Sequence, residues 1–386
     1  MNLPCKKPNP QNEGSPMRTQ MRSLLVALAA LFAALAIGAC GDDDDDGGDS
    51  GGEEGGGGSI AFLLPESQTA RYEALDKPLF EAKVEELCPD CEILYQNADQ
   101  DPTKQQQQVE AAVTEGVDVM VLDPVDSTAS AGLATRAKQA DIPVISYDRL
   151  ILDADLDYYV QFDSVEVGRQ QATALSEELA ANDAPEGPIV KINGDPKDNN
   201  AALFKEGSNE VFEEEGVEIA EEVDTPDWLP ENAQQSMEGM ITSVGADEIA
   251  GVYAANDGTA GGAIAAMKAN GMDPTEIPVT GQDAELTAIQ RIIAGEQFMT
   301  VYKPIQPLAE ATAEIAVAVA NGEEPPADLI NSETDNGTEA VPTASIDTIA
   351  VTSENVADTI IAEEVYPVEE ICTDEYAKAC EDAGIE

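Results

Sequence analysis

The side chains best suited to chemistry in this sequence are charged and amide groups that directly follow apolar runs. Asp123 follows the run 117–122, and Asp148 and Arg149 follow the run 142–147. Further polar groups occupy the same kind of position at Arg71, Asp195 to Asn200, Asn256, Asp257, Gln282, Asp283 and Lys303. Carboxylate and guanidinium groups form paired hydrogen bonds with adjacent hydroxyls. This chemistry suits the binding of a sugar.

Two aromatic residues could complete such a site. Trp228, the only tryptophan, and Tyr72 would offer flat apolar faces to the C–H face of a pyranose. A hydrogen bond to a charged group contributes about 1.5–3 kcal/mol, so several together reach roughly micromolar affinity after the cost of ordering.

The composition excludes several other functions. The chain has no histidine, which removes serine triads and histidine acid–base chemistry. Its 77 acidic and 19 basic residues give a net charge of −58. Phosphates of nucleic acids and anionic membrane surfaces would repel such a chain. We expect no cofactor and no metal site.

The elements that must position the polar groups are alternating strands and helices. Short apolar runs separated by segments of helical spacing predict βαβ units and parallel sheets. Strands are expected at 60–64, 91–95, 117–122, 142–147, 188–192, 217–223, 249–254, 277–280 and 298–302, and helices at 71–87, 103–115 and 127–139. In such sheets, ligands bind beyond the carboxyl ends of the strands. The polar groups listed above follow these ends.

An internal repeat divides the chain into two lobes. The segment that begins at Val117 resembles the one that begins at Ile249, and each continues to an Ile-Pro-Val strand. Asp123 and Asp148 are 25 residues apart, and Asp257 and Asp283 are 26 residues apart. We therefore predict an α/β protein with two similar, doubly wound, parallel-sheet lobes joined by a hinge.

The N-terminal residues predict export. The uncharged run from Leu24 to Ile37 is too short to cross a bilayer and fits the apolar region of a signal peptide. Small residues lead to Cys40, as in the cleavage signal of bacterial lipoproteins. We predict a signal peptide over 1–39, a lipid on Cys40, and a disordered acidic, Gly-rich tether over 40–58.

The four remaining cysteines of the exported chain suggest disulfides. Cys88 could pair with Cys91, and Cys372 with Cys380. A redox-active Cys88–Cys91 pair and a four-cysteine zinc site are the alternatives. The position of Cys88 at the end of a helix and the seven residues between Cys372 and Cys380 argue against them.

Several segments resemble the bacterial D-xylose-binding proteins, which belong to the ribose-type family of periplasmic sugar-binding proteins. They are Ser146–Ile151, Asp198–Phe204, Trp228–Ala233, Ala255–Ala263, Gly281–Ala284 and Met299–Pro304. The resemblance covers roughly 59–321. The sequence differs from the family pattern in three places. They are Tyr72, where the family has a tryptophan, the loop 65–70, and the chain after Asn321.

This resemblance implies the type 1 periplasmic binding protein fold and a set of sugar contacts. The implied contacts are Arg71, Tyr72, Asp148, Arg149, Asp198, Asn200, Trp228, Asn256, Asp283 and Lys303. We expect one lobe over 59–163 and 304–345, and the other over 164–303 and 346–386. Hinges are expected near Asp163, Lys303 and Ile346.

The resemblance also implies a role. We expect an extracytoplasmic, lipid-anchored monomer that captures a monosaccharide, with D-xylose first, and passes it to the permease of an ABC importer. A sugar sensor for a chemoreceptor or kinase is the alternative with the same sequence features. A glycosidase that uses Asp148 and Asp283 is a weaker alternative, because Arg149 and Lys303 would keep both carboxylates ionised. Either aspartate could instead cap a helix.

Overall fold

The computed structural model describes residues 57–181 and 187–385. The predicted signal peptide, Cys40 and residues 40–56 of the predicted tether lie outside these ranges. No helix of the described part is long and apolar enough to cross a bilayer.

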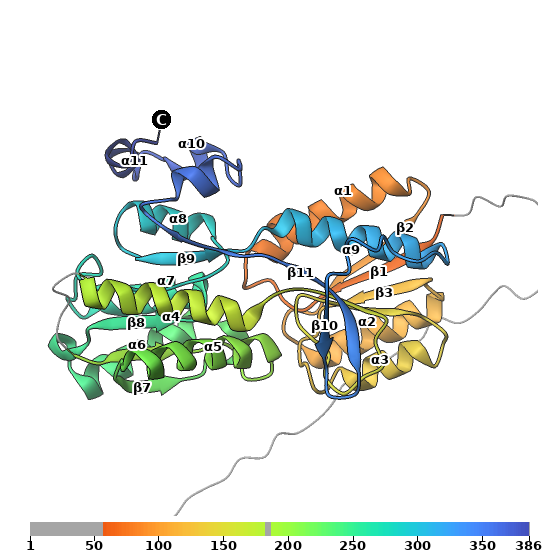
Figure 1. The fold of residues 1–386 in the computed structure, drawn as a ribbon, viewed down its shortest axis with the longest axis horizontal. Coiled ribbons are helices and arrows are strands. Elements are labelled where there is room, and N and C mark those ends of the chain that lie inside the picture. Colours follow the sequence, from red (N-terminus) through yellow and green to blue (C-terminus); the bar gives the residue numbers. More distant parts are fainter. Residues whose placement is uncertain (1–56, 182–186, 386) are drawn as a thin grey trace, which may run out of the picture. The chain divides into compact units, whose positions relative to one another are not determined.

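The first lobe is built on a seven-stranded sheet with the strand order β10-β11-β5-β4-β3-β1-β2 (Figure 1). Its strands are β1 (Ser59–Leu64), β2 (Glu92–Asn97), β3 (Val119–Leu122), β4 (Val144–Tyr147), β5 (Tyr158–Phe162), β10 (Ser332–Asp335) and β11 (Ala340–Ile346). All neighbours pair in parallel except β10 and β11. The antiparallel hairpin of β10 and β11 lies after Asn321, where the resemblance to the family ends and no strand was predicted.

Helices cover both faces of this sheet. They are α1 (Lys77–Leu87), α2 (Pro102–Glu115), α3 (Ala131–Lys138) and α9 (Ile305–Ala320). Successive residues of a strand point to opposite faces. Phe62 of β1 therefore packs in the core with α1 and α9, and its neighbour Leu63 packs in the core with α2 and α3. Burial on both faces explains why the central strands β1, β3 and β4 are nearly continuous apolar runs.

The second lobe has a three-stranded parallel sheet and a separate antiparallel pair. Its strands are β6 (Ile189–Ile192), β7 (Ile219–Val223), β8 (Gly251–Ala254), β9 (Met299–Tyr302) and β12 (Ile349–Thr352). Its main helices are α4 (Ser164–Ala181), α5 (Asn199–Glu215), α6 (Pro230–Val244), α7 (Asp257–Ala269) and α8 (Leu286–Ile293). One core lies under α6 and α7, and another under α4 and α5.

Three predicted elements need correction. The segment 277–280 is not a regular strand, since it forms one isolated bridge from Val279 to Val252. Pro278 has no N–H to donate, so the ladder cannot continue there. The helix expected from Ser127 begins at Ala131. The helix expected from Arg71 begins as a short π-helix, η1 (Tyr72–Asp76), before α1.

The chain after β12 forms a small covering on α8. It contains η4 (Ala357–Ile361), α10 (Val368–Ile371) and α11 (Ala377–Ala383). Two short 3₁₀ helices, η2 (Pro226–Trp228) and η3 (Ala246–Glu248), lie earlier in the second lobe. Ile360, Ile371 and Cys380 pack with Ile289 and Ile292 of α8. Sulfur–sulfur distances of 2.02 Å and 1.97 Å show the disulfides Cys88–Cys91 and Cys372–Cys380.

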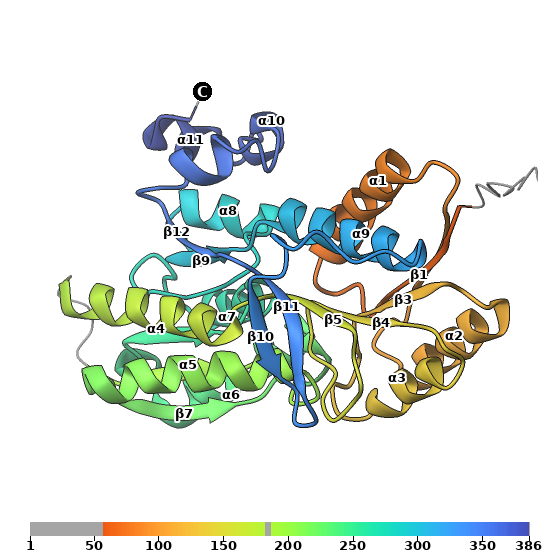
Figure 2. The same cartoon turned by 45° about the vertical axis from the view of Figure 1, so that its right-hand side comes forward.

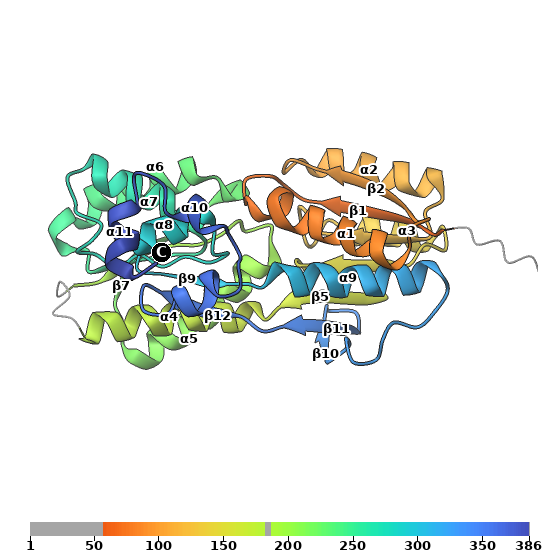
Figure 3. The same ribbon diagram turned by 90° about the horizontal axis from the view of Figure 1, so that it is seen from above.

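Three segments connect the two lobes. The chain crosses at Asp163 between β5 and α4, at Lys303 and Pro304 between β9 and α9, and at 347–348 between β11 and β12. Figures 2 and 3 show these crossings from two further directions. The two lobes and their doubly wound sheets agree with the predicted fold class. The strand ends of both lobes border the cavity described next.

Candidate functional site

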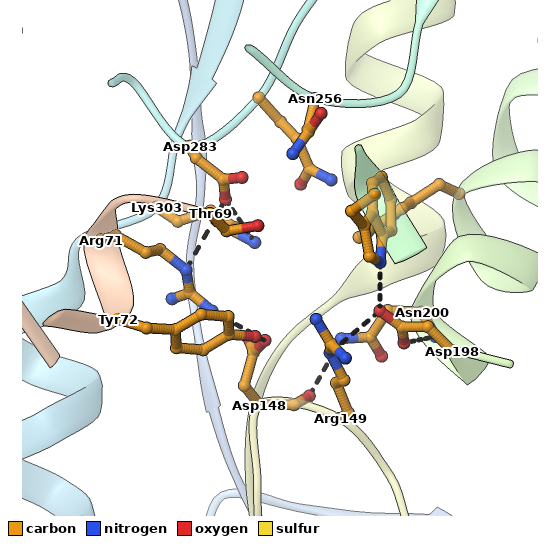
Figure 4. A pocket seen from close by; sticks show the side chains of 13 residues that line it. Thr69, Arg71, Tyr72, Asp148, Arg149, Asp198, Asn200, Asn256, Asp283 and Lys303 are labelled. Atoms are coloured by element: carbon orange, nitrogen blue, oxygen red, sulfur yellow. Dashed lines mark hydrogen bonds and ion pairs between the residues drawn. The ribbon is translucent and has the colours of Figure 1, made fainter. Parts of the chain in front are cut away.

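One cavity is lined by residues of both lobes (Figure 4). The space between its lining atoms that protein does not fill measures about 270 Å³ and is partly open to solvent. The lining residues are Thr69, Arg71, Tyr72, Asp148, Arg149, Asp198, Asn200, Phe204, Trp228, Asn256, Gln282, Asp283 and Lys303. All ten residues predicted as sugar contacts are among them.

The first lobe contributes a buried ion pair with a tyrosine. Arg71 Nη2 lies 2.7 Å from Asp148 Oδ2, and the Tyr72 hydroxyl donates to the same oxygen over 2.9 Å. Arg71 also lies 3.4 Å from Asp76 of η1. Its guanidinium is 4.7 Å from the centre of the Tyr72 ring. These contacts hold Arg71 and the tyrosine ring in one orientation at the cavity wall.

Asp283 of the second lobe has a cation partner from each lobe. Its Oδ1 lies 2.8 Å from Lys303 Nζ and 3.8 Å from Arg71 Nε. Lys303 follows β9 and is only 4% exposed. Burial of the three charged groups is tolerable because each has an opposite charge beside it.

Asp148 and Asp283 reach the cavity by the same backbone geometry. The Asp148 N–H donates to Val160 O of β5, and the Asp283 N–H donates to Val301 O of β9, each over 2.9 Å. Their φ angles are 53° and 93°. Positive φ is unusual outside glycine, and non-glycine residues with strained backbone angles cluster at functional sites. Neither aspartate caps a helix in the structure.

A second charged group bridges the lobes at Arg149. Its Nε lies 3.0 Å from Asp198 Oδ2, which also accepts a hydrogen bond of 3.1 Å from Trp228 Nε1. Within its own lobe, Arg149 lies 3.4 Å from Glu66 Oε1 and 3.7 Å from Asp123 Oδ1. Arg149 therefore stands among three carboxylates, two of its own lobe and one of the other.

Helix starts in the second lobe position the amide side chains. Asp198 caps α5 by accepting from Asn200 N, and Asn256 caps α7 by accepting from Thr259 N. Asn200 Nδ2 donates to Asp148 O of the first lobe over 3.1 Å. A cap fixes the side chain beside the helix axis, so Asp198 and Asn256 have little freedom to leave the cavity, and the bond to Asp148 O restrains Asn200.

Trp228 depends on a glycine for its place. It lies at the end of η2 with a φ of 53° and is 4% exposed. A Cβ atom at Gly194 would lie 1.9 Å from the tryptophan ring. Only glycine in the loop after β6 therefore lets the ring lie against the backbone.

Three lining residues were not among the predicted contacts. Phe204 stands within a segment of family resemblance, and Gln282 directly precedes Asp283, so both had a usable signal. Thr69 lies in the loop 65–70, where the resemblance fails. No pattern in the sequence pointed to it.

Several buried polar atoms of the lining are left without a hydrogen-bond partner among the described residues. They include Asn200 Oδ1 and Gln282 Oε1. Arg71 Nη1, Arg149 Nε and Asp283 Oδ1 are ion-paired but lack an aligned hydrogen bond within the described part of the chain. An unmade buried hydrogen bond costs about 1–3 kcal/mol. A ligand with several hydroxyl groups would supply both the donors and the acceptors that these atoms require.

The charges in the cavity fix the protonation of Asp148. Burial opposes ionisation, but Arg71, Lys303 and Arg149 together lower the pKa of Asp148 to about 2. Burial raises the pKa of Asp198 against the opposing effect of Arg149. Asp148 is thus ionised near neutral pH and can accept hydrogen bonds, but it has no proton to give as a general acid.

Comparison with known proteins identifies the family. Residues 60–324 match the model of the periplasmic binding protein domain. The chain belongs to this family. It is 40% identical over 290 residues to the D-xylose-binding periplasmic protein of Escherichia coli (strain K12), which covers 74% of this chain and 84% of that protein. It is 37% identical over 300 residues to the protein of the same name from Haemophilus influenzae, covering 77% and 87%.

Solved structures of periplasmic binding proteins support the same fold. A carbohydrate transporter solute-binding protein from Chloroflexus aurantiacus in complex with D-glucose has a TM-score of 0.72 and 29% identity. It matches 81% of this chain and 97% of its own. A solute-binding protein from Clostridium phytofermentans with bound β-D-glucose also has a TM-score of 0.72, at 27% identity over 81% and 99% of the chains. This periplasmic binding protein is a receptor and not an enzyme, as the sequence predicted.

Proposed function

We propose that this periplasmic binding protein captures a monosaccharide, with D-xylose as the first candidate, between two closing lobes. It delivers the sugar to the permease of an ABC importer. The observation that carries the proposal is a cavity in which both lobes present ionised groups and unpaired polar atoms. A ring of hydroxyl groups is complementary to that arrangement.

The choice of D-xylose rests on similarity. The D-xylose-binding relatives are the two matches of 40% and 37% identity, and each is covered over more than four-fifths of its length. The cavity residues that both lobes supply are those carried over from that family. The glucose-bound structures make D-glucose the second candidate, followed by D-ribose and L-arabinose.

We further propose how the lobes move. The domains comprise 59–163 with 304–345 and 164–303 with 346–386. The crossings at Asp163, at Lys303 and Pro304, and at 347–348 serve as the hinges. A sugar that contacts both lobes binds the closed arrangement better than the open one and so shifts the equilibrium towards closure.

The proposed location is outside the cytoplasm. The signal peptide over 1–39 directs export, and a lipid on Cys40 holds the protein at the membrane near the permease. The protein acts as a monomer.

Calorimetric titration of the purified protein with D-xylose, D-glucose, D-ribose and L-arabinose tests the proposal. We expect saturable binding of one sugar at roughly micromolar affinity or tighter. Arg149→Met should abolish it, because the substitution leaves Asp198 buried without its cation. Arg136→Met, which alters a half-exposed arginine on α3, is the matched control and should bind normally. Silence from all four sugars would reject this ligand class.

A further inference from the structure

The two lobes also touch at a place outside the cavity. Ser127, in the loop after β3, donates its N–H to Lys197 O of the second lobe over 3.0 Å. The Asn199 N–H of the second lobe donates to Ser127 Oγ over 3.1 Å. Ser127 is 2% exposed and does not line the cavity. Two hydrogen bonds thus join the lobes without any part in holding the ligand.

The first-lobe side of this contact is braced by its own lobe. Gln105 of α2 donates to Asp123 O over 2.7 Å and accepts from Val125 N over 2.9 Å, and both bonds are buried. Leu152 N donates to Ser127 O over 2.9 Å. Ser127 is therefore held in place whether or not the second lobe is near.

The second-lobe side is braced in a similar way. Asp195 accepts from Lys197 N and from Asp227 N, each over 3.0 Å, and so ties the loop after β6 to η2. Lys197 Nζ lies 3.1 Å from Asp227 Oδ1. Neither loop has to refold when the lobes approach, so the contact can form by rigid movement alone.

The contact gives a hydrogen-bond acceptor to the first N–H of α5, the helix whose start carries two cavity residues. Asn199 is the first residue of α5, and its N–H cannot be satisfied within the helix. Asp198 accepts from Asn200 N, and Ser127 accepts from Asn199 N. The first lobe therefore supplies the missing acceptor for the segment that places Asp198 and Asn200 in the cavity.

We propose that Ser127 is a positioning residue for closure, which raises sugar affinity by stabilising the closed lobes without touching the sugar. The proposal rests on the proposed function as a sugar receptor. When the lobes separate, both hydrogen bonds are lost and their groups return to water. The contact favours closure equally for every sugar, because it lies outside the cavity.

Two substitutions remove the Asn199–Ser127 bond from opposite sides. Ser127→Ala removes the acceptor. Asn199→Pro removes the donor at the first helical position, where proline is well tolerated, and Asp198 before it already has extended backbone angles. Thr128→Ala, at an exposed neighbour, and Asn199→Ala, which keeps the N–H, are the matched controls.

Sugar titration of these variants gives the first result. Ser127→Ala and Asn199→Pro should each weaken binding about five- to tenfold, through faster dissociation, and the double variant should lose no more than either alone. The ratio of affinities for two sugars should stay unchanged. Unchanged affinity in Ser127→Ala would overturn the proposal, and so would an altered ratio, which would place Ser127 in contact with the sugar.

Amide hydrogen exchange, measured with and without the sugar that binds in titration, tests the contact itself. The Asn199 N–H should gain protection when the sugar binds the parent protein and should gain none in Ser127→Ala, while the core amides of β3 and β6 stay protected throughout. An Asn199 amide that stays unprotected in the sugar-bound parent protein would overturn the proposal. Failure of the parent protein to bind any sugar in titration would reject the proposed function instead.

Discussion

Asp148 and Asp283 occupy matching positions in the two lobes, but they have different ion-pair and hydrogen-bond partners. Both follow the repeat, both donate their N–H to the next strand over 2.9 Å, and both have positive φ angles. Asp148 is bound by Arg71 and Tyr72 of its own lobe. Asp283 is bound by Lys303 and approached by Arg71 from the other lobe. Repetition of the fold supplied the carboxylates, whereas loops unique to each lobe supplied the cations.

A second matched pair diverges further. Asp123 and Asp257 follow equivalent strands and are both fully buried. Asp257 is hydrogen-bonded within its lobe to Gln297, Thr300 and the backbone of Glu285. Neither carboxylate oxygen of Asp123 has a hydrogen-bond partner among the described residues, and one lies 3.7 Å from Arg149 Nε. The same position stabilises the fold in one lobe and faces the binding-site arginine in the other.

The largest effect on affinity is expected when either matched carboxylate of the cavity is removed. Asp148→Ala and Asp283→Ala should each weaken sugar binding at least about 100-fold, since the first removes the nearest carboxylate of buried Arg71 and the second removes the ion-pair partner of buried Lys303. Calorimetric titration measures this loss. Asp273→Ala, at an exposed aspartate of the second lobe, is the control. If only one of the two cavity variants lost binding, the lobes would not share the ligand equally.

A tenfold effect is expected from the aromatic face of the second lobe. Gly194→Ala would place a Cβ atom 1.9 Å from the Trp228 ring, which must then leave the cavity wall. We expect affinity to fall about tenfold, together with a shift in the emission of this single tryptophan. Gly258→Ala is the control, because a Cβ there would lie 3.6 Å from its nearest neighbour. An unshifted emission spectrum in Gly194→Ala would contradict the packing described.

The smallest effect on affinity is expected for Asp257→Asn, because Asp257 does not line the cavity and contributes to the stability of the fold. Burial raises the pKa of Asp257 from 3.8 to about 7. Its contribution to stability is therefore complete below about pH 4 and is lost as the pH rises to 7. Asp148 has the opposite sign, since its pKa is lowered from 3.8 to about 2, and its contribution is lost as the pH falls from 4 to 2.

Thermal unfolding between pH 2 and 8 separates these two contributions. The parent protein should be most stable near pH 4. Asp257→Asn should flatten the fall in Tm between pH 4 and 7, although Glu285, whose pKa burial raises to about 8, keeps part of it. Asp148→Asn should flatten the fall below pH 4. An unchanged dependence of Tm on pH in Asp257→Asn would contradict the raised pKa of this carboxyl.

All ten residues predicted as sugar contacts line the cavity, whereas the strands were predicted less completely. The ten predicted contacts stand at strand ends or helix starts, and in a parallel α/β fold the chain order alone brings those positions together. Thr69 was missed because it lies in the loop 65–70, where the resemblance to the family fails. Strands β5, β10, β11 and β12 were not predicted. In β10, polar residues such as Ser332 and Asp335 hide the strand signal.

The contact at Ser127 could not have been predicted from the sequence. A serine near a helix start is ordinarily read as a local cap. Here its hydroxyl accepts from Asn199, 72 residues away and in the other lobe. The bond forms only because the fold brings the loops after β3 and β6 together, and no local sequence pattern predicts that placement.

A crystal structure of the protein with the sugar that binds in titration is the most direct test of a ligand shared by two lobes. We expect one sugar molecule in the cavity, with Asp148 and Arg149 of the first lobe and Asn256 and Asp283 of the second within hydrogen-bonding distance. Its ring should lie against the Trp228 side chain. A sugar held by one lobe alone, or bound outside the cavity, would contradict the account.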